Sequence, residues 1–262
     1  MSCRTATWSC FGSMSSPELA ESGCPRDRIQ SVDALRGASI LLMVLYHLGY
    51  NLVSFGMLPD QVLFNPLLSF LQVVFSSIFI ALCGFSSRYS RSNARRGGRI
   101  LLLALCVTAV TYFVPNNWIL FGILHFLGLA LLLYALTRSV FDRVPQKVQP
   151  WLYMGLFLAF YFLLTYLNAP AHNVHNPPHL WILGIADAHF SSADYFPLLP
   201  WFFMFLFGTW LGEVSRENRM PAWFYEFHCP PLAAVGRHTL LIYIAHQPVI
   251  LLLVYALWRM GS

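Results

Sequence analysis

Charged side chains are scarce in this sequence. Of its 262 residues, 10% are Asp, Glu, Lys or Arg and 57% are hydrophobic, whereas a soluble domain carries about 25% charged residues. The mean hydropathy is +0.59. A core of this size cannot enclose so much apolar surface, so the bilayer must serve as the solvent. No long polar stretch follows residue 28, which excludes a separate soluble domain.

Two further absences concern the first segment and the cysteines. Residues 1–28 lack an apolar core of signal-peptide length, so we expect a disordered cytoplasmic tail there. Residues 29–262 are then expected to form a single transmembrane domain. The topology derived below leaves no cysteine in an outside loop, which excludes a disulfide framework.

Long apolar runs take up most of the remaining chain. A crossing needs about 20 residues, and seven runs approach that length. We therefore predict an all-α, polytopic membrane helix bundle of about seven transmembrane helices, with six or eight as the alternatives. The predicted spans cover residues 36–56, 66–87, 99–114, 118–137, 151–168, 197–214 and 239–258.

The basic residues give this bundle an expected orientation. In a seven-helix arrangement, one side of the membrane receives the segments 1–36, 88–99, 138–147 and 213–237. They contain 15 of the 16 Lys and Arg residues, and the exception is Arg259. Because cytoplasmic loops carry an excess of Lys and Arg, we expect the N-terminus inside and the C-terminus outside. The net charge of +5 is then a topology signal, and we predict no nucleic-acid partner.

Three histidines fall inside predicted spans, where ionisable groups are costly. They are His47, His125 and His246, in the first, fourth and seventh spans. Arg, Lys or Asp at the membrane centre costs about 2.5–3.5 kcal/mol on insertion scales, and such groups usually face a cavity. Neutral histidine costs less. A single histidine of this kind is more often a hydrogen-bonded core residue than a reactive one, but three together favour a polar cavity.

The first span places a carboxylate, a cation and a histidine on one helix face. At 100° per residue, His47 lies about 20° from Arg36 and about 40° from Asp33 around the helix. The rise of 1.5 Å per residue separates Arg36 from His47 by about 16.5 Å along the axis. Such a stripe suits a long anionic ligand. The alternative is an interfacial ion pair of Asp33 with Arg36 that anchors the helix.

Three other motifs are assigned structural roles. The arginine-rich segment 87–99 is mainly a topology signal, although Arg also matches phosphate geometry. Gly208 and Gly212 form a small-xxx-small pair, which favours close helix packing. The stretch "HNVHNPPH" at 172–179 contains a Pro-Pro pair that breaks any helix able to align metal ligands, so we predict no metal site.

Five stretches of the chain resemble the short bacterial members of the heparan-α-glucosaminide N-acetyltransferase catalytic-domain family. They are "RIQSVDALRGASILLMVLYH", "FSSIFIALCGFSSR", "FGILHFLGLALLL", "SSADYFPLLPWFFMFLFGTWLG" and "GRHTLLIYIAHQPVI". The resemblance covers residues 28–258. The opening D-x-x-R-G, with a histidine later in the same helix, is also similar to acyltransferase family 3, a related group of membrane acyltransferases.

The resemblance implies an acetyl-CoA-dependent transmembrane acetyltransferase without a metal cofactor. Acetyl-CoA would enter from the cytoplasm, and the acetyl group would pass to an extracytoplasmic acceptor, an amino sugar or another glycan. Asp33 and Arg36 would meet the phosphates and nucleotide of CoA, with Arg99 and Arg237 as weaker candidates at the same level. The pantetheine arm would then place the thioester near His47.

The family resemblance leaves the identity of the catalytic base open. The family's lysosomal enzyme has Asn at the position of His47, and its proposed catalytic histidine lies in the following outside loop. The corresponding loop here, "GMLPDQVLFNP", contains no histidine. We therefore expect the base to be His47, or else a histidine from another helix, because imidazole titrates near pH 6.5. His125 and His246 are candidates to orient the acceptor or polarise the thioester carbonyl.

Acceptor binding is assigned to Asp194, Tyr195 and Trp201 at the outer entrance of the sixth span, with Gln247 beside the last histidine. An aromatic ring near a carboxylate suits an amino sugar, although Tyr and Trp also populate membrane interfaces for other reasons. We prefer direct attack in a ternary complex, with an acetyl-histidine intermediate as the minority alternative.

Two other kinds of protein remain as alternatives. One is a seven-helix transporter or glycan-lipid flippase without acyl transfer, against which stands the lack of an inverted repeat. The other is a structural partner of another membrane protein. The expected location is the bacterial plasma membrane, with the bilayer, acetyl-CoA and the acceptor as partners and a homo-oligomer also allowed. The acceptor, the choice of N- or O-acetylation and the number of subunits stay open.

Overall fold

The structure is a computed structural model that describes residues 29–63, 65–113, 118–173, 176–177 and 179–261. The disordered tail predicted for residues 1–28 lies outside this range. The described chain is helical, and no strand occurs in it beyond a single bridge between Phe121 and Tyr195. The long helices are α1 (Gln30–Ser54), α2 (Pro66–Ser87), α3 (Asn93–Thr111), α4 (Ile123–Phe141), α5 (Gln149–Leu167), α6 (Leu198–Arg216) and α9 (Thr239–Gly261).

Six of these seven helices are long and apolar enough to cross a membrane. The helix outside that set is α3, which has 19 residues and carries Arg95, Arg96 and Arg99 in its first two turns. It begins six residues before the predicted span because Ser92 caps it, accepting a hydrogen bond from the Arg95 amide at 3.3 Å. The predicted all-α, polytopic helix bundle is confirmed.

Glycines set the closest approach between α2 and α6. A Cβ atom on Gly208 would overlap the carbonyl group of Ala81, and one on Gly212 would crowd Phe85. Phe205 and Leu206, just before these glycines on α6, are completely buried. Lipid tails are as apolar as leucine, so helices associate in a bilayer largely through such close packing. The packing role predicted for Gly208 and Gly212 is confirmed.

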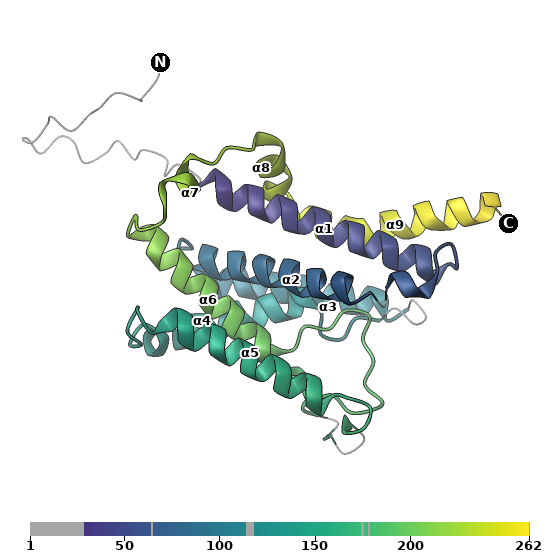
Figure 1. Cartoon of the computed structure of the whole chain (residues 1–262), viewed down its shortest axis with the longest axis horizontal. Helices are drawn as coiled ribbons and strands as arrows, with labels where there is room; N and C mark the ends of the chain where they lie inside the picture. The colour runs from purple at the N-terminus through teal and green to yellow at the C-terminus, as the bar shows by residue number, and fades with distance from the viewer. Residues whose placement is uncertain (1–28, 64, 114–117, 174–175, 178, 262) are drawn as a thin grey trace, which may run out of the picture.

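The last span is the single helix α9, and the two short helices before it also pack against α1. Two short helices, α7 (Ala222–Glu226) and α8 (Pro230–Arg237), precede α9. Figure 1 shows α8 beside the first half of α1 and α9 beside its second half. Gly236 meets α1 at Gly37, and Trp258 meets Phe55, the residue just after α1. The first and last helices of the bundle therefore run in the same direction, as an odd number of crossings between them requires.

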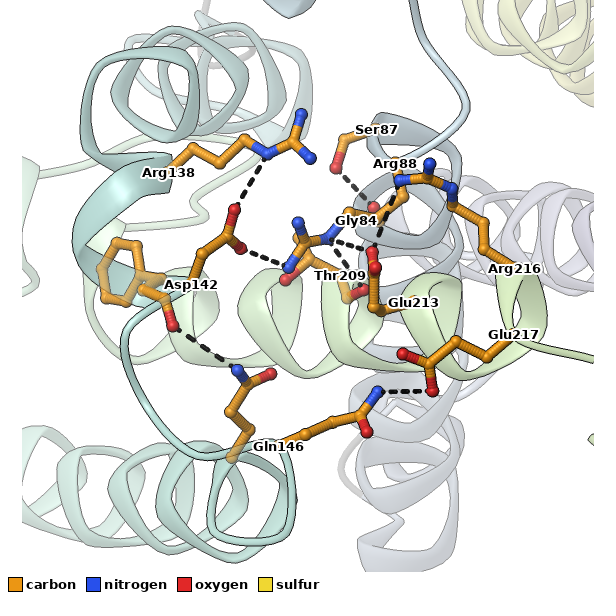
Figure 2. A network of polar contacts seen from close by, with 12 residues as sticks. Gly84, Ser87, Arg88, Arg138, Asp142, Gln146, Thr209, Glu213, Arg216 and Glu217 are labelled. Atoms are coloured by element: carbon orange, nitrogen blue, oxygen red, sulfur yellow. Dashed lines mark hydrogen bonds and ion pairs between the residues drawn. The ribbon is translucent and has the colours of Figure 1, made fainter. Parts of the chain in front are cut away.

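One end of the bundle collects most of the ion pairs of the described residues, and we call it the charged end; Figure 2 shows the network there from close by. It is centred on Arg88 at the end of α2, whose guanidinium pairs with Asp142 at 2.7 Å and with Glu213 at 3.4 Å. Arg138 and Arg216 join the same network. Its members come from three segments predicted to share one side of the membrane, and the structure brings these segments together. Which side is cytoplasmic stays a prediction.

Candidate functional site

A cavity of about 800 Å³ opens at the charged end. Its walls come from the start of α1, the end of α2, the end of α6 and the segment that follows α6. Asp33 and Arg36 both line it, and their side chains form an ion pair at 3.0 Å. The Arg36 guanidinium also donates a hydrogen bond to the Ser86 hydroxyl of α2. The cavity thus contains the carboxylate and cation that the α1 sequence predicts on one helix face.

The other two predicted donor-site residues lie elsewhere. Arg99 on α3 and Arg237 at the end of α8 are both exposed, and neither is among the residues that line this cavity. The structure therefore separates the stronger candidates, Asp33 and Arg36, from the weaker ones.

The charges on the cavity wall are mixed. Besides the Asp33–Arg36 pair, the wall carries Glu213, Arg216 and Glu217. Each of the two glutamates is paired, Glu213 with Arg216 at 3.5 Å and Glu217 with a neighbouring arginine at 2.9 Å. Hydrogen bonds from Gln146 and from that arginine lower the pKa of the Glu217 carboxyl. An anion that enters must therefore compete with carboxylates for the two guanidinium groups.

A pair of histidines joins α1 to α9 farther along the bundle. The ring centroids of His47 and His246 are 5.0 Å apart. Next to them, the Asn51 side chain donates to the Gln247 side chain at 3.3 Å and to the backbone carbonyl of His47 at 2.9 Å. Three residues predicted for the site, His47, His246 and Gln247, are thus brought together by the first and last helices, although the two histidines are 199 positions apart in the chain.

The two histidine rings differ in their hydrogen bonding. Nδ1 of His246 lies 2.6 Å from the carbonyl oxygen of Tyr243, one turn earlier in α9. Nε2 of His246 is buried and has no partner within the described part of the chain. The same residues provide no hydrogen bond to the ring of His47, which is only half-buried.

Tyr243 connects the histidine pair to the loop before α6. Its hydroxyl donates to Oδ2 of Asp194 at 3.2 Å, and the same oxygen accepts the backbone N–H of Ile123 at 3.0 Å. Burial raises the pKa of the Asp194 carboxyl, while these two hydrogen bonds act in the opposite direction. Sequence reasoning missed Tyr243. Its only signal was its position three residues before His246 in "LLIYIAHQPVI".

His125 has both ring nitrogens occupied. Nδ1 accepts the backbone N–H of Gly122 at 3.2 Å, which caps the start of α4. Nε2 lies 3.0 Å from the hydroxyl of Thr108, whose proton is donated to the Ile119 carbonyl at 2.6 Å. Nε2 must then carry the ring proton. This buried ring ties α3 to α4, and the catalytic role predicted for it stays a prediction.

The predicted acceptor residues lie in two different places, with Asp194 and Tyr195 in the loop before α6 and Trp201 in α6 itself. Asp194 points to α4 and α9, as described above. Tyr195 and Trp201 instead line a second cavity of about 370 Å³, together with Tyr161 and other residues of α5 and the loop. The Tyr195 hydroxyl donates to the backbone carbonyl of Trp181 at 2.5 Å. This volume is near the lower end of the roughly 300–1,000 Å³ common for small-ligand sites.

Metal chemistry has no candidate centre in the part of the chain that the structure describes. No group of three or more His, Cys, Asp or Glu side chains there could hold a metal ion. Part of the histidine-rich stretch at 172–179 falls outside the described residues.

These features define a multi-pass membrane protein with a polar, histidine-containing interior and a ligand-sized cavity at its charged end. Comparison with protein families then gives the particular family. The chain belongs to the heparan-alpha-glucosaminide N-acetyltransferase catalytic family, whose model matches residues 28–248. Neither the curated proteins nor the solved structures gave a match. Membership in this family makes the protein a membrane-embedded acetyltransferase.

Proposed function

We propose that this protein transfers an acetyl group across the membrane, from acetyl-CoA at the charged end to a sugar or glycan acceptor at the other end. One observation carries the proposal. Arg36 lines the 800 Å³ cavity, and the same helix brings His47 against His246, about 16.5 Å farther along its axis. A single helix therefore connects a cavity of cofactor size to a pair of imidazoles.

The donor half of the site would bind CoA through its phosphates. A phosphate would replace Asp33 at the Arg36 guanidinium, because the planar fork of arginine matches phosphate as well as carboxylate geometry. Arg216, on the same wall, offers a second cation. The pantetheine arm would then extend along α1 and bring the thioester to the level of His47.

The acceptor half of the site would approach from the loop before α6. An amine or hydroxyl must lose a proton as it attacks the thioester carbonyl, and an imidazole is well suited to accept that proton near neutral pH. Gln247, next to the histidine pair, could orient the acceptor by hydrogen bonds. The aromatic cavity at Tyr195 and Trp201 would hold an adjoining sugar ring. We propose direct attack in a ternary complex.

Orientation and location complete the proposal. The basic segments at the charged end would face the cytoplasm, where acetyl-CoA is available, and the acceptor loop would face out. We propose the bacterial plasma membrane as the location, with the lipid bilayer as the obligatory surroundings.

The reaction can be tested directly. The purified protein is reconstituted in liposomes and supplied with acetyl-CoA and a panel of amino sugars and glycans, and release of the free CoA thiol is followed. Acetylated product and CoA in equal amounts would support the proposal. Movement of an acceptor across the bilayer without CoA release would instead favour the transporter or flippase alternative.

The donor site has its own test in Arg36→Ala. Loss of one hydrogen-bonded charge pair of about 1.5–3 kcal/mol should raise the KM for acetyl-CoA roughly 10–150-fold. The KM for acetyl-pantetheine, which lacks the nucleotide and its phosphates, should change little. Arg91→Ala, an exposed arginine just after α2, is the matched control. Equal loss with both donors would show that Arg36 only anchors α1.

A further inference from the structure

The hydrogen bonds of His246 fix the position of its proton. A carbonyl oxygen can only accept, so the 2.6 Å contact with Tyr243 means that Nδ1 is the donor. In the neutral ring, Nε2 is then the basic nitrogen, with a free lone pair. His125 has the opposite arrangement, because its Nδ1 accepts a backbone N–H.

The lone pair of His246 lies in a place where an unpaired acceptor is costly. His246 is only 9% exposed, and Nε2 has no hydrogen-bond partner among the described residues. Buried polar atoms are paired in the great majority of cases, and an exception calls for an explanation. A ligand that donates a hydrogen bond to Nε2 would supply the missing partner.

We propose that His246, rather than His47, is the general base, and that Tyr243 is the residue that positions it. This proposal rests on the acetyl transfer proposed above and assigns roles within it. His47 lies 5.0 Å away between ring centroids, and no partner among the described residues fixes its tautomer. It is free to direct an N–H group at the thioester carbonyl.

The step balances without any further reactant. The acceptor nitrogen or oxygen forms a bond to the acetyl carbonyl carbon, while its proton passes to Nε2 of His246. The C–S bond breaks, and the sulfur leaves with the bonding electron pair. The thiolate then takes the proton from the imidazolium, which gives the acetylated acceptor, the free CoA thiol and neutral His246.

Tyr243 acts on this base through two different groups. Its backbone carbonyl holds Nδ1–H of His246, and its hydroxyl is anchored to Asp194. Asp194 is in turn held by the N–H of Ile123 at the start of α4, where a helix terminus favours a carboxylate. The helix α9 is thus fixed to the rest of the bundle at the residue one turn before the base.

The assignment of the base is tested with glutamine variants. His246→Gln should lower kcat by roughly 10²–10⁴-fold, as expected for loss of a general base, with acetyl-CoA binding retained. His47→Gln keeps an N–H donor and should stay within about tenfold of the wild type, whereas His47→Ala should lose roughly 10²–10³-fold, like removal of an oxyanion donor. His189→Gln, in the exposed loop, is the control. An inactive His47→Gln beside an active His246→Gln would overturn the assignment, and so would equal losses.

The positioning role is tested with Tyr243→Phe, which removes only the hydroxyl. We expect kcat to fall about fivefold, which corresponds to loss of one hydrogen bond of about 1 kcal/mol, with the KM for acetyl-CoA unchanged. Asp194→Asn, which can still accept from Tyr243, should retain more activity than Asp194→Ala. An unchanged kcat in Tyr243→Phe would remove the tyrosine from this role.

The tautomer can be measured even if no acceptor is ever found. Nitrogen-15 NMR of histidine-labelled protein in detergent distinguishes a protonated from a bare ring nitrogen. The signals lost in His246→Gln should belong to a ring with a protonated Nδ1 and a bare Nε2. Those lost in His125→Gln should show the opposite tautomer. A protonated Nε2 on His246 would refute the assignment, independently of whether acetyl transfer occurs.

Discussion

Arg88 holds three helix ends together at the charged end, and its removal should be among the more damaging single changes in the molecule. Its side chain is 5% exposed. It pairs with Asp142 after α4 and Glu213 on α6, and it donates to the Thr209 carbonyl at 3.4 Å. Its guanidinium carbon also lies 5.7 Å from the ring centroid of Tyr134.

The loss of stability in Arg88→Ala depends on the positive charges that remain beside its two carboxylate partners. Breaking a buried ion pair by removing one member costs about 3–5 kcal/mol, because the other charge is left uncompensated. Asp142 retains Arg138 at 3.1 Å, and Glu213 retains Arg216 at 3.5 Å. Both carboxylates therefore stay partly compensated, and we expect Arg88→Ala to cost near the lower limit, about 3 kcal/mol.

The matched control pairs with the same carboxylate. Arg138 is 45% exposed, and an exposed ion pair contributes only about 0.2–1 kcal/mol. The free energy of unfolding of the wild type, Arg88→Ala and Arg138→Ala is measured by denaturant titration in detergent, with tryptophan fluorescence as the signal. A loss in Arg88→Ala no greater than that in Arg138→Ala would refute the reasoning from burial.

Three further predictions concern acid stability, helix packing and topology. Burial raises the pKa of the Asp142 carboxyl, but two neighbouring guanidinium groups lower it below its ordinary value. Its stabilising contribution is therefore complete above the unfolded pKa of about 3.9 and is lost as the pH falls below it; Asp142→Asn should weaken this dependence in acid denaturation curves. Gly208→Ala should cost about 1–3 kcal/mol by overpacking, whereas Gly155→Ala, where a Cβ meets nothing within 4 Å, should cost none; equal melting temperatures would contradict the packing argument. Cysteines placed at Arg95 and Asn173 should react with an impermeant thiol reagent from opposite sides of the membrane, and labelling from one side would contradict seven crossings.

The helices were predictable because their signals are local. The second predicted span, 66–87, coincides with α2, which begins at a proline and is capped by the Asn65 side chain. The fourth predicted span, 118–137, begins five residues before α4 does. The apolar run continues through Trp118 and Ile119, but α4 begins only at Ile123, after the cap formed by Gly122 and His125.

The candidate site was predictable in its residue types but not in its connections. Apolar surroundings made His47 and His246 conspicuous, and no helical period could show that their rings meet. The bond between Tyr243 and Asp194 joins positions 49 residues apart, and a tyrosine in an apolar helix gives no sign of such a partner. The contact between Nε2 of His125 and Thr108 likewise depends on the neighbouring helix α3.

The parallel arrangement of α1 with α8 and α9 has a consequence for biosynthesis. The ribosome produces α1 first and α9 last, so His47 enters the membrane long before His246 is made. Chains fold progressively from the N-terminus during synthesis, and the histidine pair can form only when the final helix docks beside the first. An unfinished or truncated chain would lack one of the two imidazoles, so the acetyl transfer proposed above would be confined to fully assembled molecules.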